Sequence, residues 1–198
     1  MSIPTKPSDT PSIRSRAFKL TSYSLGLITA VCLPFTGCAD LKVKKPASDS
    51  TPPALVWNVY NQDTGAQADH SGSPTLNAKR GEHYRITLKA KDPGGVSSIK
   101  INPTIGSGEI AWTCKPILAG GENVAQSKTA TLKGVTQNLA PDSNGYVLTS
   151  IFLIFELDFG LECQPGWIAA GGNAKLTGRA SNYFGGTTTE VIKFNISP

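Results

Sequence analysis

Apolar and polar residues alternate along most of the chain beyond residue 53. Within 82–91, Tyr84, Ile86, Leu88 and Ala90 share one parity, and polar or charged residues occupy the other. Successive side chains of a strand point to opposite faces, so this segment predicts a half-buried strand. The turn-forming sequence at 92–95, Asp-Pro-Gly-Gly, ends it.

The same alternation predicts further strands at 54–60, 96–102, 109–114 and 129–135, and a closing hairpin of 173–181 and 188–196. In that hairpin the predicted inward positions are Ala174, Leu176, Gly178 and Ala180 on one strand, and Ile192, Phe194 and Ile196 on the other. Residues 61–81 are rich in small and polar residues and predict a loop. No segment has a helical stripe of any length, so the chain predicts an all-β fold.

The strongest apolar segment is 146–159. Five residues share one parity: Ile151, Leu153, Phe155, Leu157 and Phe159. The other parity carries Phe152 and Ile154 first and Glu156 and Asp158 afterwards. This pattern predicts that the first half is covered on both faces and the second half on one. An exposed face accounts for the two carboxylates better than a catalytic pair does.

The first 37 residues have the pattern of a secretory leader. Arg14, Arg16 and Lys19 precede an uncharged apolar run over 20–35, which is shorter than the roughly 20 apolar residues of a spanning helix. The run ends in Leu-Pro-Phe-Thr-Gly-Cys at 33–38, which resembles the lipobox of bacterial lipoproteins. The resemblance implies cleavage before Cys38 and attachment of lipid to its sulfur. The alternative is an ordinary secretory signal with an incidental cysteine.

Residues 38–53 are polar and contain several prolines, which predicts a flexible, lipid-anchored tether able to reach about 50 Å. Its lysines, Lys42, Lys44 and Lys45, predict either a solvated stem or contact with anionic lipid headgroups. Ala39 follows Cys38 where inner-membrane lipoproteins carry aspartate. By resemblance this favours the outer membrane of a bacterial envelope over the inner membrane.

Removal of 37 residues from 198 leaves 161, enough for one domain, predicted over 54–198. Four of the 19 basic and one of the 14 acidic residues precede Ala39, so the net charge falls from +5 to +2. Nothing in this balance favours nucleic acid as a partner. The expected partners are the membrane, through Cys38, and an envelope protein or a glycan.

The cysteines agree with an oxidising compartment. Cys32 belongs to the predicted leader and Cys38 would carry lipid, which leaves Cys114 and Cys163. We expect these two to form a disulfide, since two cysteines can pair and the compartment is expected to be oxidising. Two buried, reduced thiols are the alternative. Zinc is less favoured because the two histidines, His70 and His83, are distant in sequence.

Residues 75–101, with the turn Lys-Asp-Pro-Gly-Gly-Val, and the closing Ala-Ser-Asn-Tyr-Phe-Gly-Gly-Thr-Thr-Thr-Glu-Val-Ile-Lys-Phe-Asn-Ile resemble the B, C, F and G strands of bacterial immunoglobulin-like and cadherin-like domains. The resemblance implies an antiparallel, immunoglobulin-like β-sandwich with long loops. Cadherin-like domains bind calcium through clustered carboxylates. Asp63, Asp69, Asp92 and Asp142 lie in predicted loops without the DxD or DxNDN spacing, so no metal or cofactor is expected.

No hydrolase, metalloprotease, phosphate-loop or EF-hand motif is present in the sequence. We therefore expect a non-catalytic module for interaction, adhesion or structure. A carbohydrate-binding module is the first alternative, with Trp167, Trp112 and Tyr183 as candidate ligand-binding residues, and a sandwich-fold hydrolase is the second. His83 is expected to face solvent on the polar side of its strand.

Overall fold

The computed structural model describes residues 42–105, 109–117 and 125–198. In these ranges the regular structure consists of strands without helices, which confirms the predicted all-β fold. None of the described residues belongs to a helix of the length and hydrophobicity needed to cross a membrane. The predicted leader over 1–37 and the lipidation site Cys38 lie outside the described residues.

The described residues form strands β1 (Lys42–Lys44), β2 (Ala54–Asn61), β3 (Gln67–His70), β4 (Thr75–Lys79), β5 (His83–Lys91), β6 (Val96–Pro103), β7 (Glu109–Pro116), β8 (Gln126–Thr131), β9 (Val135–Asn138), β10 (Tyr146–Leu148), β11 (Ser150–Asp158), β12 (Trp167–Asn182) and β13 (Thr187–Ser197). β1 and β10 form a small two-stranded sheet, and the other strands belong to two larger sheets.

The first large sheet contains β11, β5, β2 and β3 in that order, and every neighbouring pair is antiparallel. β5 confirms the alternation predicted from the sequence. Ile86 and Leu88 are completely buried, whereas Arg85 and Lys89 on the opposite side of the strand are exposed. One side of this sheet therefore faces the core and the other faces outward.

The second large sheet is built on β12. β13 pairs with residues 172–181 of β12, while β6 and β7 pair with successive parts of the other edge of β12. β9 and β8 extend the sheet beyond β6 and β7. β4 adds to β13 in parallel, so the chain moves from the first sheet to the second between β3 and β4.

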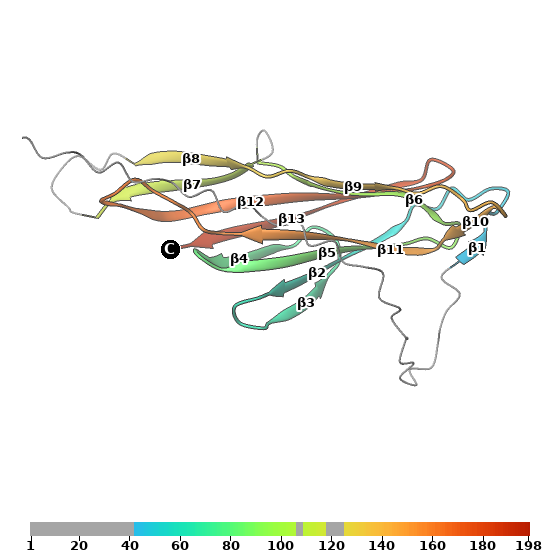
Figure 1. Ribbon diagram of the computed structural model, residues 1–198, viewed down its shortest axis with the longest axis horizontal. Coiled ribbons are helices and arrows are strands. Elements are labelled where there is room, and N and C mark those ends of the chain that lie inside the picture. Colours follow the sequence, from blue (N-terminus) through green and yellow to red (C-terminus); the bar gives the residue numbers. More distant parts are fainter. Residues whose placement is uncertain (1–41, 106–108, 118–124) are drawn as a thin grey trace, which may run out of the picture. The chain divides into compact units, whose positions relative to one another are not determined.

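The two large sheets pack face to face as an antiparallel β-sandwich, seen as two layers in Figure 1. Tyr84 of β5 and Phe194 of β13 meet Phe159 between the layers, with ring centroids 5.4 to 5.6 Å apart and tilted planes. Such tilted contacts are favourable for aromatic rings. The inward positions predicted for the closing hairpin are confirmed, since Leu176 and Ile192 are completely buried.

The predicted loop over 61–81 is wrong, because it contains β3 and β4. β3 has the sequence Gln-Ala-Asp-His, which lacks an apolar alternation, and it is held by backbone pairing with Trp57–Tyr60 of β2. His70 consequently lies in a strand. An edge strand can be held by backbone hydrogen bonds alone, so its side chains need not show an apolar alternation.

The predicted strand over 129–135 is also wrong, because β8 ends at Thr131 and β9 begins at Val135. Between these two strands the chain crosses from the edge of β7, with which β8 pairs, to the edge of β6, with which β9 pairs. Gly134 passes so close to β6 that an added Cβ would lie 2.8 Å from the backbone oxygen of Ile101. A side chain at this position would obstruct the crossing.

β11 differs from its prediction on one face. Ile151 and Phe155 point inward and are 7% and 5% exposed, as expected. Phe152 and Ile154, which were expected to be covered, are 59% and 47% exposed. The prediction fails because alternation shows which residues share a face, and the presence of a covering layer depends on the assembled fold.

The predicted flexible tether over 38–53 is wrong from Lys42 onward. β1 pairs with β10, and the backbone nitrogen of Lys45 donates to the Gly145 oxygen over 3.1 Å. Further along, the Nδ2 of Asn182 donates to the oxygens of Asp49 and Thr51 over 3.1 and 2.8 Å. These contacts make residues 42–53 part of the folded domain.

Candidate functional site

One end of the domain is closed by a disulfide. Cys114 of β7 is bonded to Cys163, with Cα atoms 5.9 Å apart, which confirms the predicted pair. Nearby, the indole nitrogen of Trp112 donates to the Glu162 oxygen over 3.1 Å. The bond and the hydrogen bond together fix the segment before β12 against β7.

The three candidate aromatic residues do not form one platform. Trp112 and Trp167 are half-buried at the disulfide end, and Trp167 is the first residue of β12, paired with Pro116. Tyr183 follows the opposite end of β12. Its hydroxyl donates to the Leu139 oxygen over 3.2 Å, and Lys45 Nζ lies 5.2 Å from its ring centroid.

A shallow groove lies beside Trp112. It has a volume of about 340 Å³ and is lined partly by the hydroxyl-bearing residues Thr113, Ser127 and Thr129, and by Lys115. Gly171 and Gly172 of β12 also line it. The groove can offer hydrogen bonds and one tryptophan side chain, Trp112, but Trp167 does not line it.

A second cavity of about 410 Å³ lies where β3 and β4 form edges of the two sheets. Val59, Ala68 and Leu76 contribute apolar surface to it. Its polar part is made by Glu82 and Tyr84. The Tyr84 hydroxyl donates to Glu82 Oε2 over 2.6 Å, and the Lys79 backbone nitrogen donates to the same oxygen over 2.8 Å.

These two polar groups titrate outside the neutral range. Burial, together with the neighbouring Glu82 carboxylate, raises the pKa of Tyr84 above its usual value. Burial alone would raise the pKa of Glu82, but the hydrogen bonds from Tyr84 and from the Lys79 backbone outweigh it and lower that pKa. The cavity therefore presents a neutral phenol and a carboxylate, a pair suited to hydrogen bonding with a ligand.

The outer face of the first sheet carries a row of ion pairs. Arg85 Nε donates to Glu156 Oε1 over 2.8 Å. His83 Nδ1 lies 3.2 Å from Asp63 Oδ2, and His83 Nε2 lies 3.7 Å from Asp158 Oδ1. The backbone nitrogen of His83 also donates to Asp63 and lowers the pKa of that carboxyl group.

The row confirms two expectations. His83 is 52% exposed at its side chain, and the two strand carboxylates lie on an outward face. The sequence did not indicate Asp63 as a partner of His83, because Asp63 lies 20 positions earlier, beyond the end of β2. The sequence did carry a signal for the other ion pair, Glu156 with Arg85. Their opposite charges favour directly paired positions on neighbouring strands.

The four aspartates considered for calcium have separate surroundings. Asp63 pairs with His83, Asp69 accepts from Asn58 Nδ2 over 2.6 Å, and Asp142 accepts from the backbone nitrogen of Tyr146 over 2.9 Å. Asp92 is completely buried and accepts from the Gly94 nitrogen over 2.7 Å. In the described ranges no group of three or more His, Cys, Asp or Glu residues has the placement to hold a metal ion.

Asp92 has an unusual environment for a carboxyl group. Burial raises its pKa, and the nearby charge of Asp49 raises it further, although the hydrogen bond from Gly94 acts in the opposite direction. Asp92 Oδ2 lacks a hydrogen-bond partner among the described residues. This carboxyl group belongs to the junction between the 42–53 segment and the turn after β5.

Comparisons with known proteins identify no family for this chain. A scan against protein-family models matches none, and a search of the curated proteins finds no match to this chain.

Proposed function

We propose that this chain is a lipid-anchored protein of the bacterial cell envelope, and that its β-sandwich is a non-catalytic module for interaction, adhesion or structural support. The observation that carries the proposal is the position of the first described strand relative to the lipobox. Only three residues separate Cys38, the lipobox cysteine, from Lys42 at the start of β1. Cleavage before Cys38 would remove the leader and leave the folded domain intact.

The sandwich is proposed to be immunoglobulin-like. The strands that resemble B, C, F and G correspond to β5, β6, β12 and β13. β5 lies in one sheet, and β6, β12 and β13 are neighbours in the other, which is the distribution of these strands in immunoglobulin domains. This arrangement supports the proposal.

The anchor is tested by the intact mass of protein extracted from bacterial membranes. We expect a mass that begins at Cys38 and includes acyl chains, and we expect the Cys38→Ser variant to lack them. A wild-type mass without lipid would overturn the anchor. The same sample should gain two hydrogens on treatment with a thiol reductant, which reports the Cys114–Cys163 bond independently.

The proposed location is the outer membrane, because alanine follows Cys38. Separation of the two membranes by density tests it. The Ala39→Asp variant should move to the inner-membrane fraction, and Ala39→Ser should remain in the outer-membrane fraction. Equal distribution of all three proteins would contradict the sorting argument and leave the anchor unaffected.

The cavity between β3 and β4 is the proposed site for a protein partner. Its mainly apolar lining and the two adjacent strand edges suit a partner's extended segment with an apolar side chain. A photo-crosslinking residue at Leu76, in the full lipoprotein within cells, should capture a discrete envelope protein. The control is the same residue at exposed Arg179 on β12, which is not among the residues that line the cavity. Identical products at the two positions would contradict the assignment.

The groove beside Trp112 favours a second candidate function, carbohydrate binding. Hydroxyl side chains and one indole are the groups that sugars contact, and the groove offers both. If the protein binds a glycan, Trp112→Ala should weaken that binding at least tenfold, and Tyr183→Ala should not, because Tyr183 lies at the other end of β12. Unchanged binding by Trp112→Ala would exclude this groove.

A further inference from the structure

β10 and β11 carry a line of apolar side chains on their outward side, which we call the apolar stripe: Tyr146, Leu148, Phe152 and Ile154. Burial alternates at every position from Tyr146 to Asp158, through the bend at Thr149, so the even-numbered residues share the outward side. Tyr146, Phe152 and Ile154 are 43%, 59% and 47% exposed. They are three of the large exposed apolar side chains of the described chain.

Lysines face this stripe from the neighbouring strands. Lys44 is paired with Tyr146 and Lys42 with Leu148 across the β1–β10 sheet. On β5, Lys91 is paired with Ser150 and Lys89 with Phe152. Directly paired residues of antiparallel strands lie on the same face with Cβ atoms about 5 Å apart, so each lysine borders the stripe.

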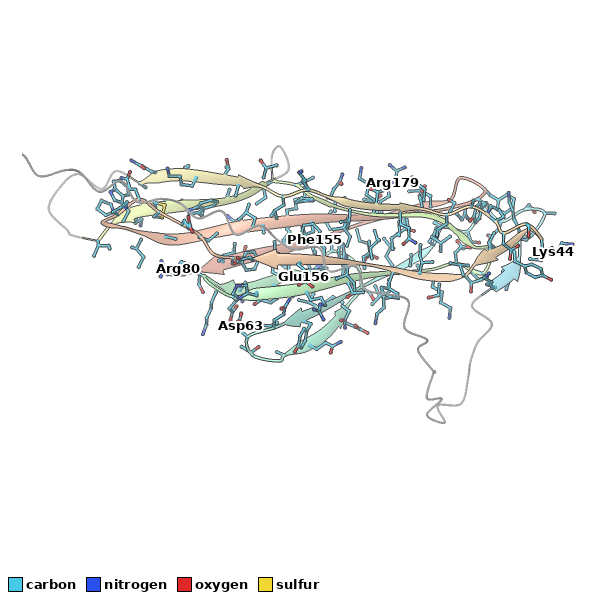
Figure 2. All side chains as sticks on the ribbon, viewed as in Figure 1. Lys44, Asp63, Arg80, Phe155, Glu156 and Arg179 are labelled. Atoms are coloured by element: carbon cyan, nitrogen blue, oxygen red, sulfur yellow. A yellow bond between two sulfur atoms is a disulfide. The ribbon has the colours of Figure 1, made fainter. Side chains whose placement is uncertain are left out.

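The charge pattern changes beyond Ile154. The next outward residues of β11, Glu156 and Asp158, are paired with Arg85 and His83 in the ion-pair row described above. The apolar stripe and its lysines are therefore confined to β1, β10 and the end of the first sheet that lies next to them. Figure 2 shows Lys44 at this end and Glu156 farther along β11.

Two acidic groups face the lysines. Lys42 Nζ lies 3.6 Å from Asp142, and Lys89 Nζ lies 3.8 Å from Asp69. The lysine side chains in these pairs remain 60% and 49% exposed. Exposed pairs of this kind are weak, so both lysines stay able to interact with another anion.

The short distance between the stripe and the proposed anchor favours the lipid bilayer as the surface that covers the stripe. A chain extends by at most about 3.6 Å per residue, so the Cα of Lys42 lies within about 14 Å of the Cα of Cys38. Acyl chains on Cys38 would then hold β1 and β10 at the level of the lipid headgroups. Lysines beside exposed aromatic and aliphatic side chains are the combination that binds an anionic bilayer surface.

We propose that the apolar stripe and its four lysines form a membrane-contacting surface, on which the domain lies against anionic lipid. This inference rests on the proposed lipid anchor. In this arrangement the domain is not held away from the membrane by a long tether. It has a fixed orientation, in which the segment from β10 to Ile154 contacts the bilayer. The row from Arg85 to Asp63 and the β3–β4 cavity lie beyond this contact.

The test uses the full lipoprotein, purified with its acyl mass verified and placed in vesicles. Ser150→Cys provides a free thiol within the stripe for an environment-sensitive nitrobenzoxadiazole label, and Asn195→Cys on β13 is the control. In vesicles of equal parts phosphatidylglycerol and phosphatidylcholine, the label at position 150 should shift to shorter emission wavelengths. The label at 195 should not shift, and phosphatidylcholine alone should give a smaller effect at 150.

Variants of the stripe make the test specific. Phe152→Ser with Ile154→Ser should abolish the shift at 150, whereas Ile117→Ser, which changes a side chain that is 62% exposed elsewhere, should preserve it. Lys44→Gln and Lys91→Gln should each reduce the ratio of docked to undocked domain, as reported by the label at 150, about fivefold, and Lys193→Gln on β13 should not.

Three results would overturn the inference. The first is equal emission at 150 and 195 in anionic vesicles of the acylated protein, which leaves the anchor proposal standing. The second is a shift at 150 in detergent without phospholipid that grows with protein concentration, which would assign the stripe to a second copy of the chain. The third is an intact mass without lipid, which removes the anchor and the inference together.

Discussion

Gly178 of β12 lies directly against the indole ring of Trp57 on β2. A Cβ added at Gly178 would approach Trp57 Cζ2 to 2.5 Å and Leu88 Cδ2 to 2.8 Å. Trp57 is completely buried at this point between the two large sheets. The absence of a side chain at Gly178 is what makes room for the largest residue of the core.

Gly178→Ala should therefore lower the free energy of unfolding by about 1 to 3 kcal/mol, because the added methyl group overpacks the core. Urea denaturation measures the change. Trp57→Phe in the same background should recover part of the loss, since the smaller ring lacks the clashing atoms. Additive effects of the two substitutions would show that the residues are not coupled as described.

The disulfide is expected to contribute strongly to stability. It joins cysteines 49 positions apart, and removal of a native bond of this kind costs about 2 to 5 kcal/mol. Reductant should lower the urea midpoint of the wild-type protein by a corresponding amount. The Cys114→Ala, Cys163→Ala double variant should have the lower midpoint without reductant and should not respond to it. A wild-type midpoint insensitive to reductant would contradict this prediction.

Asp92 should make the protein less stable as the pH rises. Its pKa in the folded state lies above the usual value, so the folded protein binds the proton more tightly than the unfolded chain does. The associated stability is complete below the unfolded pKa of about 4 and is lost as the pH rises through the folded pKa. Asp92→Asn should therefore be more stable than wild type at neutral pH, with a difference that disappears in acid.

Asp142 provides a control of opposite sign. Hydrogen bonds from the backbone nitrogens of Tyr146 and Asn144, aided by Lys42, lower its pKa. Its contribution is present above the unfolded pKa and is lost as the pH falls through the folded pKa. Asp142→Asn should be less stable than wild type at neutral pH. If both variants change stability in the same direction, the assignment of Asp92 is wrong.

Asn182 should control the docking of the 42–53 segment. It is 3% exposed, donates to Asp49 and Thr51, and accepts from the backbone nitrogens of Phe184 and Gly186. Asn182→Ala leaves several of these groups without a partner and should cost about 3 kcal/mol. Hydrogen exchange should become faster at residues 49–53, and Asn195→Ala should leave it unchanged. Unaltered protection there would show that other contacts hold the segment.

Local pattern was sufficient for the elements whose two faces differ. The buried side of β5 and the inward residues of β13 follow from alternation, because one face of each strand meets the core and the other meets solvent. The pairing of Cys114 with Cys163 followed from counting cysteines in a domain expected to be oxidised. The aromatic residues were harder to place, since Trp112, Trp167 and Tyr183 show no pattern that indicates whether they are brought together.

The sequence by itself determined the all-β class, the closing hairpin and the disulfide pair. Only the tertiary structure decided the exposure of Phe152 and Ile154 and the docking of residues 42–53. Both depend on distant parts of the chain: a second layer is absent over that face of β11 among the described residues, and Asn182 binds Asp49 across 133 positions. Periodicity assigns a side chain to a face, but contacts between distant segments determine what lies against that face.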